Sequence, residues 1–368
     1  MDLLITGATG FLGSHFALRW LLRDTAARVG CVVRAVDAAS GLLRLRAALS
    51  RAAADEGTEV GDLLARIDAL PGNLDDPAWV DRAESWMRGP TELVHCAANL
   101  SFREADRPAV WRSNVDGTAA VLRALPRLPG TVAFNYVSTA YVAGDREGEI
   151  LEGEQGRPRN FNNPYEHSKW VAEGLVRNTC AASATPWRIM RPSIVIGHSK
   201  THRLSSQSGF YQVIDMLMHL GRQPDVAVGP IRLPVTTGTS LDLIPVDVVV
   251  DEMMGLVAAG GATGNRTFHI VAADPLRLAE VLQELTPMSG VSIEVNGPDT
   301  PLTPVAKLVM HRLHHYMPYF AFARQFDRSG TQAALGSAPC RIGIEQLRAF
   351  VGSYLVQHGH PGSLETAA

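Results

Sequence analysis

The sequence has few cysteines, no long apolar run and no strong excess of charge, and each absence excludes a class of protein. Its four cysteines are scattered and form no Cys-x-x-Cys pair, which argues against a disulfide framework or a cysteine zinc site. No stretch of about 18 residues is apolar and free of charge, so we expect no membrane-spanning helix. The net charge is −3 without a long basic run, so we expect no nucleic-acid partner.

The amino-terminal residues argue against secretion. Met1 is followed almost at once by an apolar stretch and then by glycines, which leaves no space for a charged leader and its apolar core. Together with the unpaired cysteines, this predicts a cytoplasmic protein. The histidines His311, His314 and His315 lack a supporting carboxylate or cysteine, so we predict no metal site.

The length and composition of the chain are typical of a globular enzyme. Apolar residues make up 46% and charged residues 19% of 368 residues, which is typical of a folded protein with one large domain and a smaller one. Short apolar runs alternate with helical stretches through the first two thirds of the chain, and this order predicts parallel strands that are buried on both faces. We therefore predict an α/β fold, a Rossmann-type doubly wound parallel sheet. The predicted strands are 3–5, 29–33, 93–96, 131–137 and 187–190, and the predicted helices 11–23, 42–66, 114–125 and 165–179.

The pattern changes after Pro192, where proline and glycine become frequent. We assign residues 1–197 to a dinucleotide-binding domain and expect residues 242–271 to return to it. Residues 198–241 and 272–368 are then a smaller, mostly helical substrate-binding region. These boundaries follow from the change in rhythm alone.

A glycine-rich turn between the first strand and the first helix predicts a phosphate site. Gly7 permits a tight turn, Gly10 allows the backbone to approach a pyrophosphate, and Gly13 allows the helix to pack closely on the strand. The amino terminus of the helix then faces the negative charge. The loop residues assigned to the dinucleotide are Gly7, Thr9, Gly10, Phe11, Leu12 and Gly13.

The end of the second strand favours NADPH over NADH. An enzyme that uses NAD usually has Asp or Glu there to bind the ribose hydroxyls, but this strand ends with Arg34. A guanidinium can pair with a 2′-phosphate, which a carboxylate would repel. Arg44 on the following helix is a candidate second contact, whereas the nearby Asp37 argues against this assignment.

Further residues at strand ends are candidates for the rest of the dinucleotide. An Asn-Leu pair after Gly72 could lie beside the adenine ring, and small residues follow the strand that ends near Cys96, where a flat cofactor needs space. These candidates are Asn73, Leu74, Ala97, Ala98 and Asn99.

The spacing of Tyr165 and Lys169 places a phenol and an ammonium on one face of a helix, near its start. A phenol with a pKa near 10 needs help to exchange protons at pH 7. We expect the ammonium and an oxidised nicotinamide to lower that pKa, and the phenol to protonate a carbonyl oxygen during reduction. Lys169 could also bind the nicotinamide ribose.

A hydroxyl should polarise the same carbonyl, and residues 137–141 (Val-Ser-Thr-Ala-Tyr) lie just beyond a strand, at the edge where such sheets carry chemistry. Thr139 is the first choice and Ser138 the second. Asn114 is interpreted as the N-cap of a helix, and only secondarily as an anchor for a proton relay near Lys169.

Taken together, these motifs resemble the extended short-chain dehydrogenase/reductase superfamily over nearly the whole chain. Within it, the nearest resemblance is to the fatty acyl-CoA reductase (male sterility) and thioester reductase branch. That branch is indicated by the sequence Ser-Thr-Ala-Tyr-Val at 138–142 and the sequence Arg-Pro-Ser-Ile-Val at 191–195.

The resemblance implies a catalytic triad of Thr139, Tyr165 and Lys169. It also implies NADPH-dependent reduction of an acyl thioester, on CoA or on an acyl carrier protein, to an aldehyde or an alcohol. Asn73 departs from the aspartate usual in the branch, and the chain lacks adenylation and carrier segments, so the activated acyl group is expected from elsewhere. Further cofactor contacts implied by the resemblance are Val137, Tyr165, Lys169, Pro192, Ser193 and Val195.

Three other functions use the same fold. A nucleotide-sugar epimerase or dehydratase would keep NAD bound, which Arg34 argues against. A ketone or hydroxysteroid-type reductase would use the same catalytic residues with an apolar pocket. A non-catalytic dinucleotide sensor would be expected to lack Tyr165 or Lys169.

The stretch 308–326 is rich in aromatic residues and histidine, and three interpretations remain open for it. It could cover an acyl pocket, lie against a membrane surface, or form a core helix of the smaller domain with exposed histidines.

Overall fold

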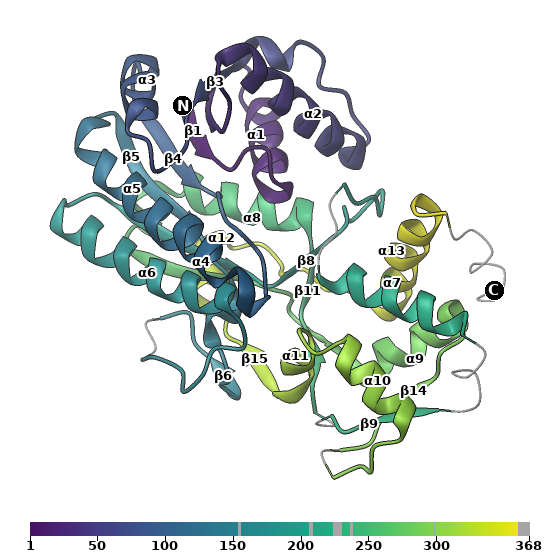
Figure 1. Cartoon of the computed structure of the whole chain (residues 1–368). Helices are drawn as coiled ribbons and strands as arrows, with labels where there is room; N and C mark the ends of the chain where they lie inside the picture. Colours follow the sequence, from purple (N-terminus) through teal and green to yellow (C-terminus); the bar gives the residue numbers. More distant parts are fainter. Residues whose placement is uncertain (154–155, 206–208, 224–229, 236–237, 298, 360–368) are drawn as a thin grey trace.

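The computed structural model describes residues 1–153, 156–205, 209–223, 230–235, 238–297 and 299–359 (Figure 1). Its centre is a seven-stranded sheet in the order β12-β7-β5-β4-β1-β2-β3, in which every neighbouring pair is parallel. The order reverses between β1 and β4, as in a doubly wound dinucleotide-binding sheet. The predicted Rossmann-type fold is confirmed. The strands are β1 (Asp2–Thr6), β2 (Val29–Val33), β3 (Ile67–Pro71), β4 (Thr91–His95), β5 (Thr131–Val137), β7 (Trp187–Pro192) and β12 (Arg266–Ile270).

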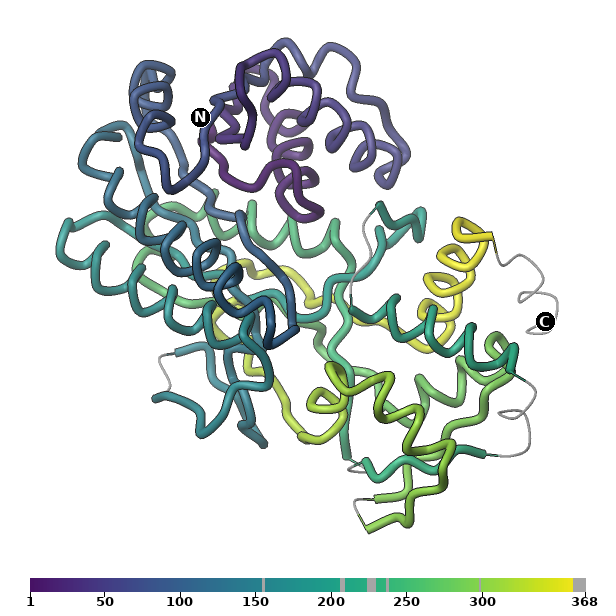
Figure 2. The backbone as a smooth tube through the Cα atoms, viewed as in Figure 1, coloured from purple at the N-terminus to yellow at the C-terminus, as the bar shows by residue number. Residues whose placement is uncertain are grey.

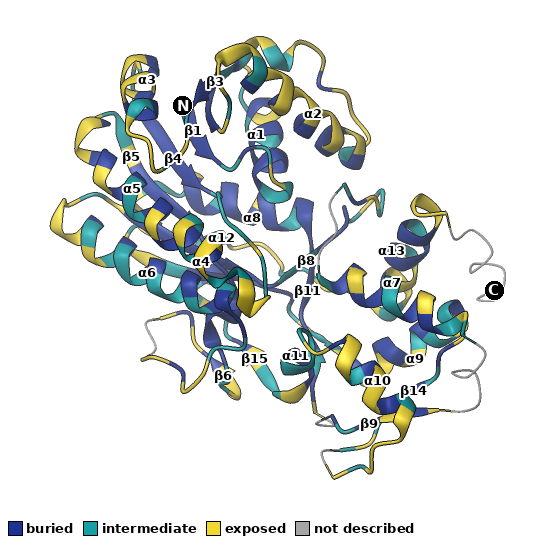
Figure 3. Ribbon diagram, viewed as in Figure 1, coloured by how far each residue is buried: buried dark blue, intermediate teal, exposed yellow. Residues whose placement is uncertain are grey.

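Helices cover both faces of this sheet, which is why its strands are nearly continuous apolar runs. Figure 3 shows the strands as buried and the outer faces of the helices as exposed. One apolar cluster joins the sheet to α1 (Phe11–Arg23), α2 (Ala38–Glu56) and α8 (Val246–Ala258). A second cluster joins the opposite face to α3 (Ala78–Trp86), α5 (Gly117–Ala124) and α6 (Pro164–Ala182).

Two predictions differ from the structure, and β3, whose residues are mixed in polarity, is not among the predicted strands. The helix predicted over 42–66 ends at Glu56, because Gly57 adopts a left-handed conformation (φ 70°), and residues 61–66 form a separate 3-10 helix. Asn114 is not an N-cap: helix α4 (Arg107–Trp111) begins earlier and continues through a π-turn (Arg112–Asp116) into α5.

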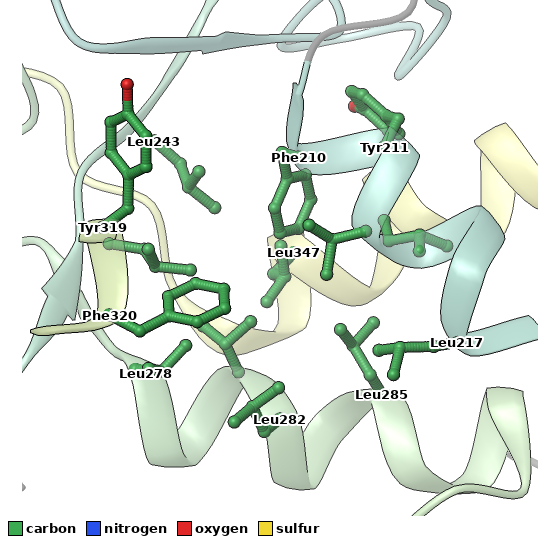
Figure 4. Close-up of a cluster of buried hydrophobic side chains, with 14 of the residues drawn as sticks. Phe210, Tyr211, Leu217, Leu243, Leu278, Leu282, Leu285, Tyr319, Phe320 and Leu347 are labelled. Carbon is green, nitrogen blue, oxygen red and sulfur yellow. The ribbon is translucent and has the colours of Figure 1, made fainter. Parts of the chain in front are cut away.

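The remaining helices gather beside the carboxyl edge of the sheet around an apolar cluster of their own (Figure 4). They are α7 (Gly209–Gly221), α9 (Leu278–Ser289), α10 (Pro304–Arg312), α11 (Met317–Ala321) and α13 (Ile344–Gln357). Two short pairs accompany them: β9 (Ile231–Leu233) with β14 (Ile293–Val295), and β10 (Ser240–Leu241) with β13 (Leu276–Arg277).

Two small parallel pairs connect this helical region to the main sheet. They are β8 (Ile194–Ile196) with β11 (Leu243–Pro245), and β6 (Gly148–Ile150) with β15 (Arg324–Phe326). Helix α12 (Ser329–Leu335) lies against α8 and β12, so this part of the stretch assigned to the substrate-binding region packs with the dinucleotide-binding half. Figure 2 shows the chain crossing between the two regions several times.

Across the part of the chain that the structure describes, no helix combines the length and the apolar character needed to cross a bilayer.

Candidate active site

The carboxyl ends of the parallel strands meet at one edge of the sheet, beside the helical region. The predicted site residues lie at or just after the ends of β1, β2, β3, β4, β5 and β7, or on helices that follow them. In open α/β sheets, ligands bind outside this edge at the point where the strand order reverses, here between β1 and β4.

The glycine-rich turn is shaped by close approaches between backbones. Gly7 has a φ of 78°, and an added Cβ would lie 2.5 Å from the backbone nitrogen of Ala97. A Cβ on Gly13 would lie 2.3 Å from the Gly7 carbonyl oxygen. Gly10 is exposed and is the N-cap of α1 without a side-chain cap, so the first N–H groups of the helix face the open edge. This arrangement fits the pyrophosphate of a dinucleotide.

The loop after β4 is fixed next to this turn by Asn114. The Asn114 side chain accepts a hydrogen bond from the Asn99 N–H (2.7 Å) and donates to the Asn99 carbonyl (2.9 Å) and to the Ser168 hydroxyl (2.9 Å). Because Ser168 precedes Lys169 on α6, Asn114 ties the loop 97–99 to the helix that carries Tyr165. This contact places Asn114 beside the residue that precedes Lys169, where the secondary interpretation expected it, and it depends on the π-helix 112–116; a proton relay there stays a prediction.

The cation at the end of β2 has a second cation beside it. Arg34 is exposed, and the Arg44 guanidinium donates a hydrogen bond to the Arg34 carbonyl. Asp37 is occupied as the N-cap of α2, where its carboxylate accepts from the Ser40 N–H (2.8 Å) and hydroxyl (2.6 Å). These bonds lower the pKa of Asp37, first through the Ser40 hydroxyl and then through its N–H. The cations, rather than Asp37, are therefore available to a ligand.

Asn73 and Leu74 follow β3 at the same edge. The Asn73 side-chain oxygen accepts from the Leu74 N–H at 3.0 Å, and the Leu74 side chain lies near Gly117 of α5. Both residues lie at the edge of the sheet next to β2. Among the described residues, the hydrogen bonds of Asn73 stay within its own loop.

Tyr165 is the second residue of α6, whose start is fixed by Pro164 and by the N-cap Asn163. Thr139, which follows β5, lies close enough to the phenol to affect its pKa. Burial raises the pKa of Tyr165 and the neighbouring Glu166 raises it further, whereas the Thr139 side chain works in the opposite direction. A phenol in this setting stays protonated, which is the form that a proton donor needs.

Lys169 is buried, and its ammonium donates to the Val137 carbonyl at 2.7 Å and lies 4.6 Å from the centre of the Tyr136 ring. Burial lowers the pKa of Lys169 to about 8, against the opposing influence of Cys96 and Glu173. The lowering of the phenol's pKa by Lys169 together with an oxidised nicotinamide stays a prediction.

Ser138, the second candidate hydroxyl, is buried directly after β5. It contributes to lowering the pKa of the buried Glu173. Burial alone would raise that pKa, but Arg191 lowers it through hydrogen bonds of 2.8 and 2.7 Å to the two carboxylate oxygens. This pair fixes the end of β7, just before Pro192, against α6.

The residues after β7 are held by Asp242. The Ser193 hydroxyl donates to the Asp242 carboxylate at 2.5 Å, and the Ala272 N–H donates to the same oxygen at 3.0 Å. Burial raises the pKa of Asp242 to about 6. Pro192 and Val195 frame this turn in β7 and β8, so the segment expected at the nicotinamide is held rigidly at the carboxyl edge.

Phe102, which the sequence did not single out, stacks on Tyr165 and links it to the aromatic stretch 308–326. The Phe102 ring is stacked on Tyr165 at 6.1 Å between centres and on Tyr319 of α11 at 5.8 Å. Tyr316, before α11, contacts the other edge of Phe102 at 6.0 Å. The segment 308–326 thus lies against the catalytic helix. The histidines His314 and His315 stack on each other at 3.7 Å.

These groups form one site with a defined chemistry. Thr139 lies near the Tyr165 phenol, the Lys169 ammonium follows one turn later on the same helix, and the glycine-rich turn lies at the same edge of the sheet. The arrangement can bind a nicotinamide dinucleotide and donate a proton to a carbonyl oxygen.

The comparisons with known proteins agree with this geometry. The model of a family described as male sterility protein matches residues 5–253. The chain is 30% identical over 298 residues to glycine betaine reductase ATRR of Emericella nidulans, covering 77% of this chain and 22% of the relative. It is 28% identical over 287 residues to aldehyde reductase lnaA of Aspergillus flavus, covering 73% of this chain and 25% of the relative.

Two solved structures extend the comparison to the fold. The terminal R domain from the myxalamid PKS-NRPS biosynthetic pathway superposes with a TM-score of 0.77 at 26% identity, covering 98% of this chain and 91% of that domain. UDP-glucuronic acid 4-epimerase from Bacillus cereus in complex with NAD shares the fold, with a TM-score of 0.67 at 17% identity over 98% of each chain. The chain spans about a quarter of the length of the first curated relatives it matches, at 22%, 26% and 25%.

Proposed function

The chain belongs to the male sterility protein family and is an oxidoreductase of the extended short-chain dehydrogenase/reductase type, and on this premise we propose that it is an NADPH-dependent reductase of acyl thioesters. The observation that carries the proposal is that Thr139 lies beside Tyr165, with Lys169 on the same helix, at the carboxyl edge of the sheet. Similarity to proteins named as reductases supports the direction of the reaction.

The residues at the edge fit NADPH. The cradle at Gly7, Gly10 and Gly13, which Cβ atoms on Gly7 and Gly13 would fill, is proposed to hold the pyrophosphate. Arg34 and Arg44 are proposed to hold the 2′-phosphate, because the only carboxylate beside them along this loop caps α2. When bound, the reduced nicotinamide supplies a hydride to the substrate carbonyl carbon.

The protein's own groups would act on the carbonyl oxygen. Thr139 and Tyr165 donate hydrogen bonds to it, which stabilises the negative charge that develops there, and Tyr165 transfers its proton. Lys169 orients the cofactor's ribose. The resulting hemithioacetal loses the thiol, which takes up a proton as the carbon–sulfur bond breaks, and an aldehyde remains. A second reduction of that aldehyde would give an alcohol.

The acyl group is proposed to arrive already activated as a thioester, either on CoA or on an acyl carrier protein. The chain spans only about a quarter of the length of these curated relatives. One solved structure of the same fold is described as a thiolation-reductase di-domain, in which a reductase accompanies a carrier domain.

The proposal is tested by following NADPH oxidation with acyl-CoA esters, an acyl carrier thioester, small ketones and nucleotide sugars. The expected result is turnover of thioesters with release of one free thiol per aldehyde, and its loss in Tyr165→Phe, which still binds NADPH. Turnover of ketones or sugars without any thioester would refute the thioester assignment.

A further inference from the structure

Glu166 directly follows the catalytic Tyr165 and is fully buried. Its carboxylate accepts hydrogen bonds from the Asn162 N–H (3.0 Å), from the side-chain amides of Asn162 and Asn163 (3.3 Å each) and from the Tyr319 hydroxyl (2.7 Å). All of these partners donate, so the arrangement stabilises the ionised carboxylate even though burial raises its pKa. Burying a carboxylic acid costs free energy unless hydrogen bonds compensate it. The reaction proposed above gives Glu166 no role that would explain this burial.

Tyr319 comes from helix α11, 153 residues away in the chain. Its hydroxyl is directed away from the apolar cluster of Phe320 and Leu278 (Figure 4). Its ring packs against Tyr141 at 4.8 Å and against Phe102 at 5.8 Å. Since Phe102 also stacks on Tyr165, the hydrogen bond and the two stacked contacts close a ring of contacts around the catalytic residue.

We propose that Glu166 and Tyr319 are a positioning pair that anchors the segment 304–321 on the catalytic helix, so that Phe102 and Tyr319 form the wall against which the acyl part of the substrate packs. The assignment rests on the proposed thioester reduction. Because the wall consists of aromatic rings, it fits an apolar or aromatic acyl group better than a charged one.

The pair also bears on the proton that Tyr165 donates. Glu166 raises the pKa of the neighbouring phenol, in the same direction as burial. The charged and titratable groups that face Glu166 from other elements are Tyr319 on α11 and Arg324 on β15. Tyr141, which packs on Tyr319, has its own pKa raised by burial and stays neutral.

The test compares Tyr319→Phe, Glu166→Gln and the double variant with wild type. We expect each single variant to lose about tenfold in kcat/KM for the acyl thioester, which corresponds to one hydrogen bond to a charged group. NADPH affinity should stay unchanged. The kcat/KM of the double variant should fall no further than that of the less active single variant, because the two residues act through one hydrogen bond. Amide hydrogen exchange in residues 304–321 should become faster in Tyr319→Phe.

Tyr354→Phe is the matched control, because the Tyr354 hydroxyl also joins two helices by donating to a carboxylate, that of Asp215, at 2.7 Å. It should keep wild-type kcat/KM and wild-type exchange in 304–321. As a readout that a purely structural role would not move, Glu166→Gln should raise the KM for a long-chain or aromatic acyl thioester and leave the KM for an acetyl thioester unchanged, because only the larger acyl group reaches the wall. This is measured by steady-state kinetics with both thioesters.

Unchanged kcat/KM in Tyr319→Phe together with unchanged exchange in 304–321, or additive losses in the double variant, would overturn the pair. If wild type reduces ketones but no thioester, the proposed function fails by itself. The same variants, measured with the ketone and by exchange, then still decide the pair.

Discussion

The buried pair of Glu173 and Arg191 predicts a large loss of stability in Glu173→Gln. The Glu173 side chain is fully buried and that of Arg191 is 6% exposed, and two charge-assisted hydrogen bonds join them. The other contacts of the Arg191 guanidinium are long, at 3.3 Å to His269 and 3.5 Å to the Glu152 carbonyl. Removing the carboxylate charge therefore leaves a buried cation without a comparable partner, which costs about 3 kcal/mol.

That cost converts into a measurable change in Tm. With an unfolding entropy of about 2.1 cal/mol/K per residue over 368 residues, about 3 kcal/mol lowers Tm by about 4 °C. Calorimetry at pH 7 measures it directly. The surface pair of Glu104 and Arg107 is the matched control, because its side chains are 71% and 39% exposed. Glu104→Gln should have the same Tm as wild type.

The pH dependence gives a second check on the same pair. The pKa of Glu173 is lower in the folded protein than its ordinary value of 4.5, so the folded state favours the ionised form. Its contribution to stability is therefore complete above about pH 4.5 and is lost as the pH falls through the folded-state pKa. The difference between wild type and Glu173→Gln should shrink in acid. A Tm within about 1 °C of wild type at pH 7 would refute the reasoning.

Three further predictions concern the cofactor edge and the proton chemistry. Arg34→Ala should raise the KM for NADPH by about tenfold or more, since it removes a charge-assisted contact, and should leave the KM for NADH unchanged; steady-state kinetics with both cofactors decides, and an unaltered preference contradicts the 2′-phosphate assignment. The kcat/KM for reduction should fall as the pH rises through about 8, where burial places the pKa of Lys169 and its ammonium is lost; a flat profile from pH 7 to about 9 would exclude this role. Gly13→Ala should abolish NADPH binding in a fluorescence titration, because its Cβ would lie 2.3 Å from the Gly7 carbonyl oxygen, whereas Gly174→Ala on α6, with nothing within 4 Å of the added Cβ, should bind normally.

The dinucleotide half could be predicted because its signals are local. A strand, a glycine-rich turn and a helix follow one another within the first 23 residues, and Gly7 and Gly13 leave no space for a Cβ beside the loop after β4 and the turn itself. Tyr165 and Lys169 are equally local, since four residues on one helix fix their common face. The charge of Arg34 at the end of β2 could also be read directly.

The boundaries that failed were set by backbone conformation or by neighbouring strands. The left-handed Gly57 ends α2 inside a run whose composition favours a longer helix, and β3 takes a mixed sequence into the sheet because β2 offers an edge to pair with. The π-turn around Asn114 left no trace in the composition. Its role depends on Asn99 and Ser168, which only folding brings together.

The sequence by itself determined that a phenol, an ammonium and a phosphate cradle lie at one edge of a parallel sheet, because each of these features is written within a few consecutive residues. Only the tertiary structure decided which residues cover that edge and which groups surround the Tyr165 phenol and shift its pKa. Glu166 meets Tyr319 across 153 residues of the chain, and Phe102, which lies still further from Tyr319 in the sequence, stacks on both Tyr165 and Tyr319. Such partners share no spacing or periodicity, so their pairing arises when the apolar helical region packs against the sheet and buries them together.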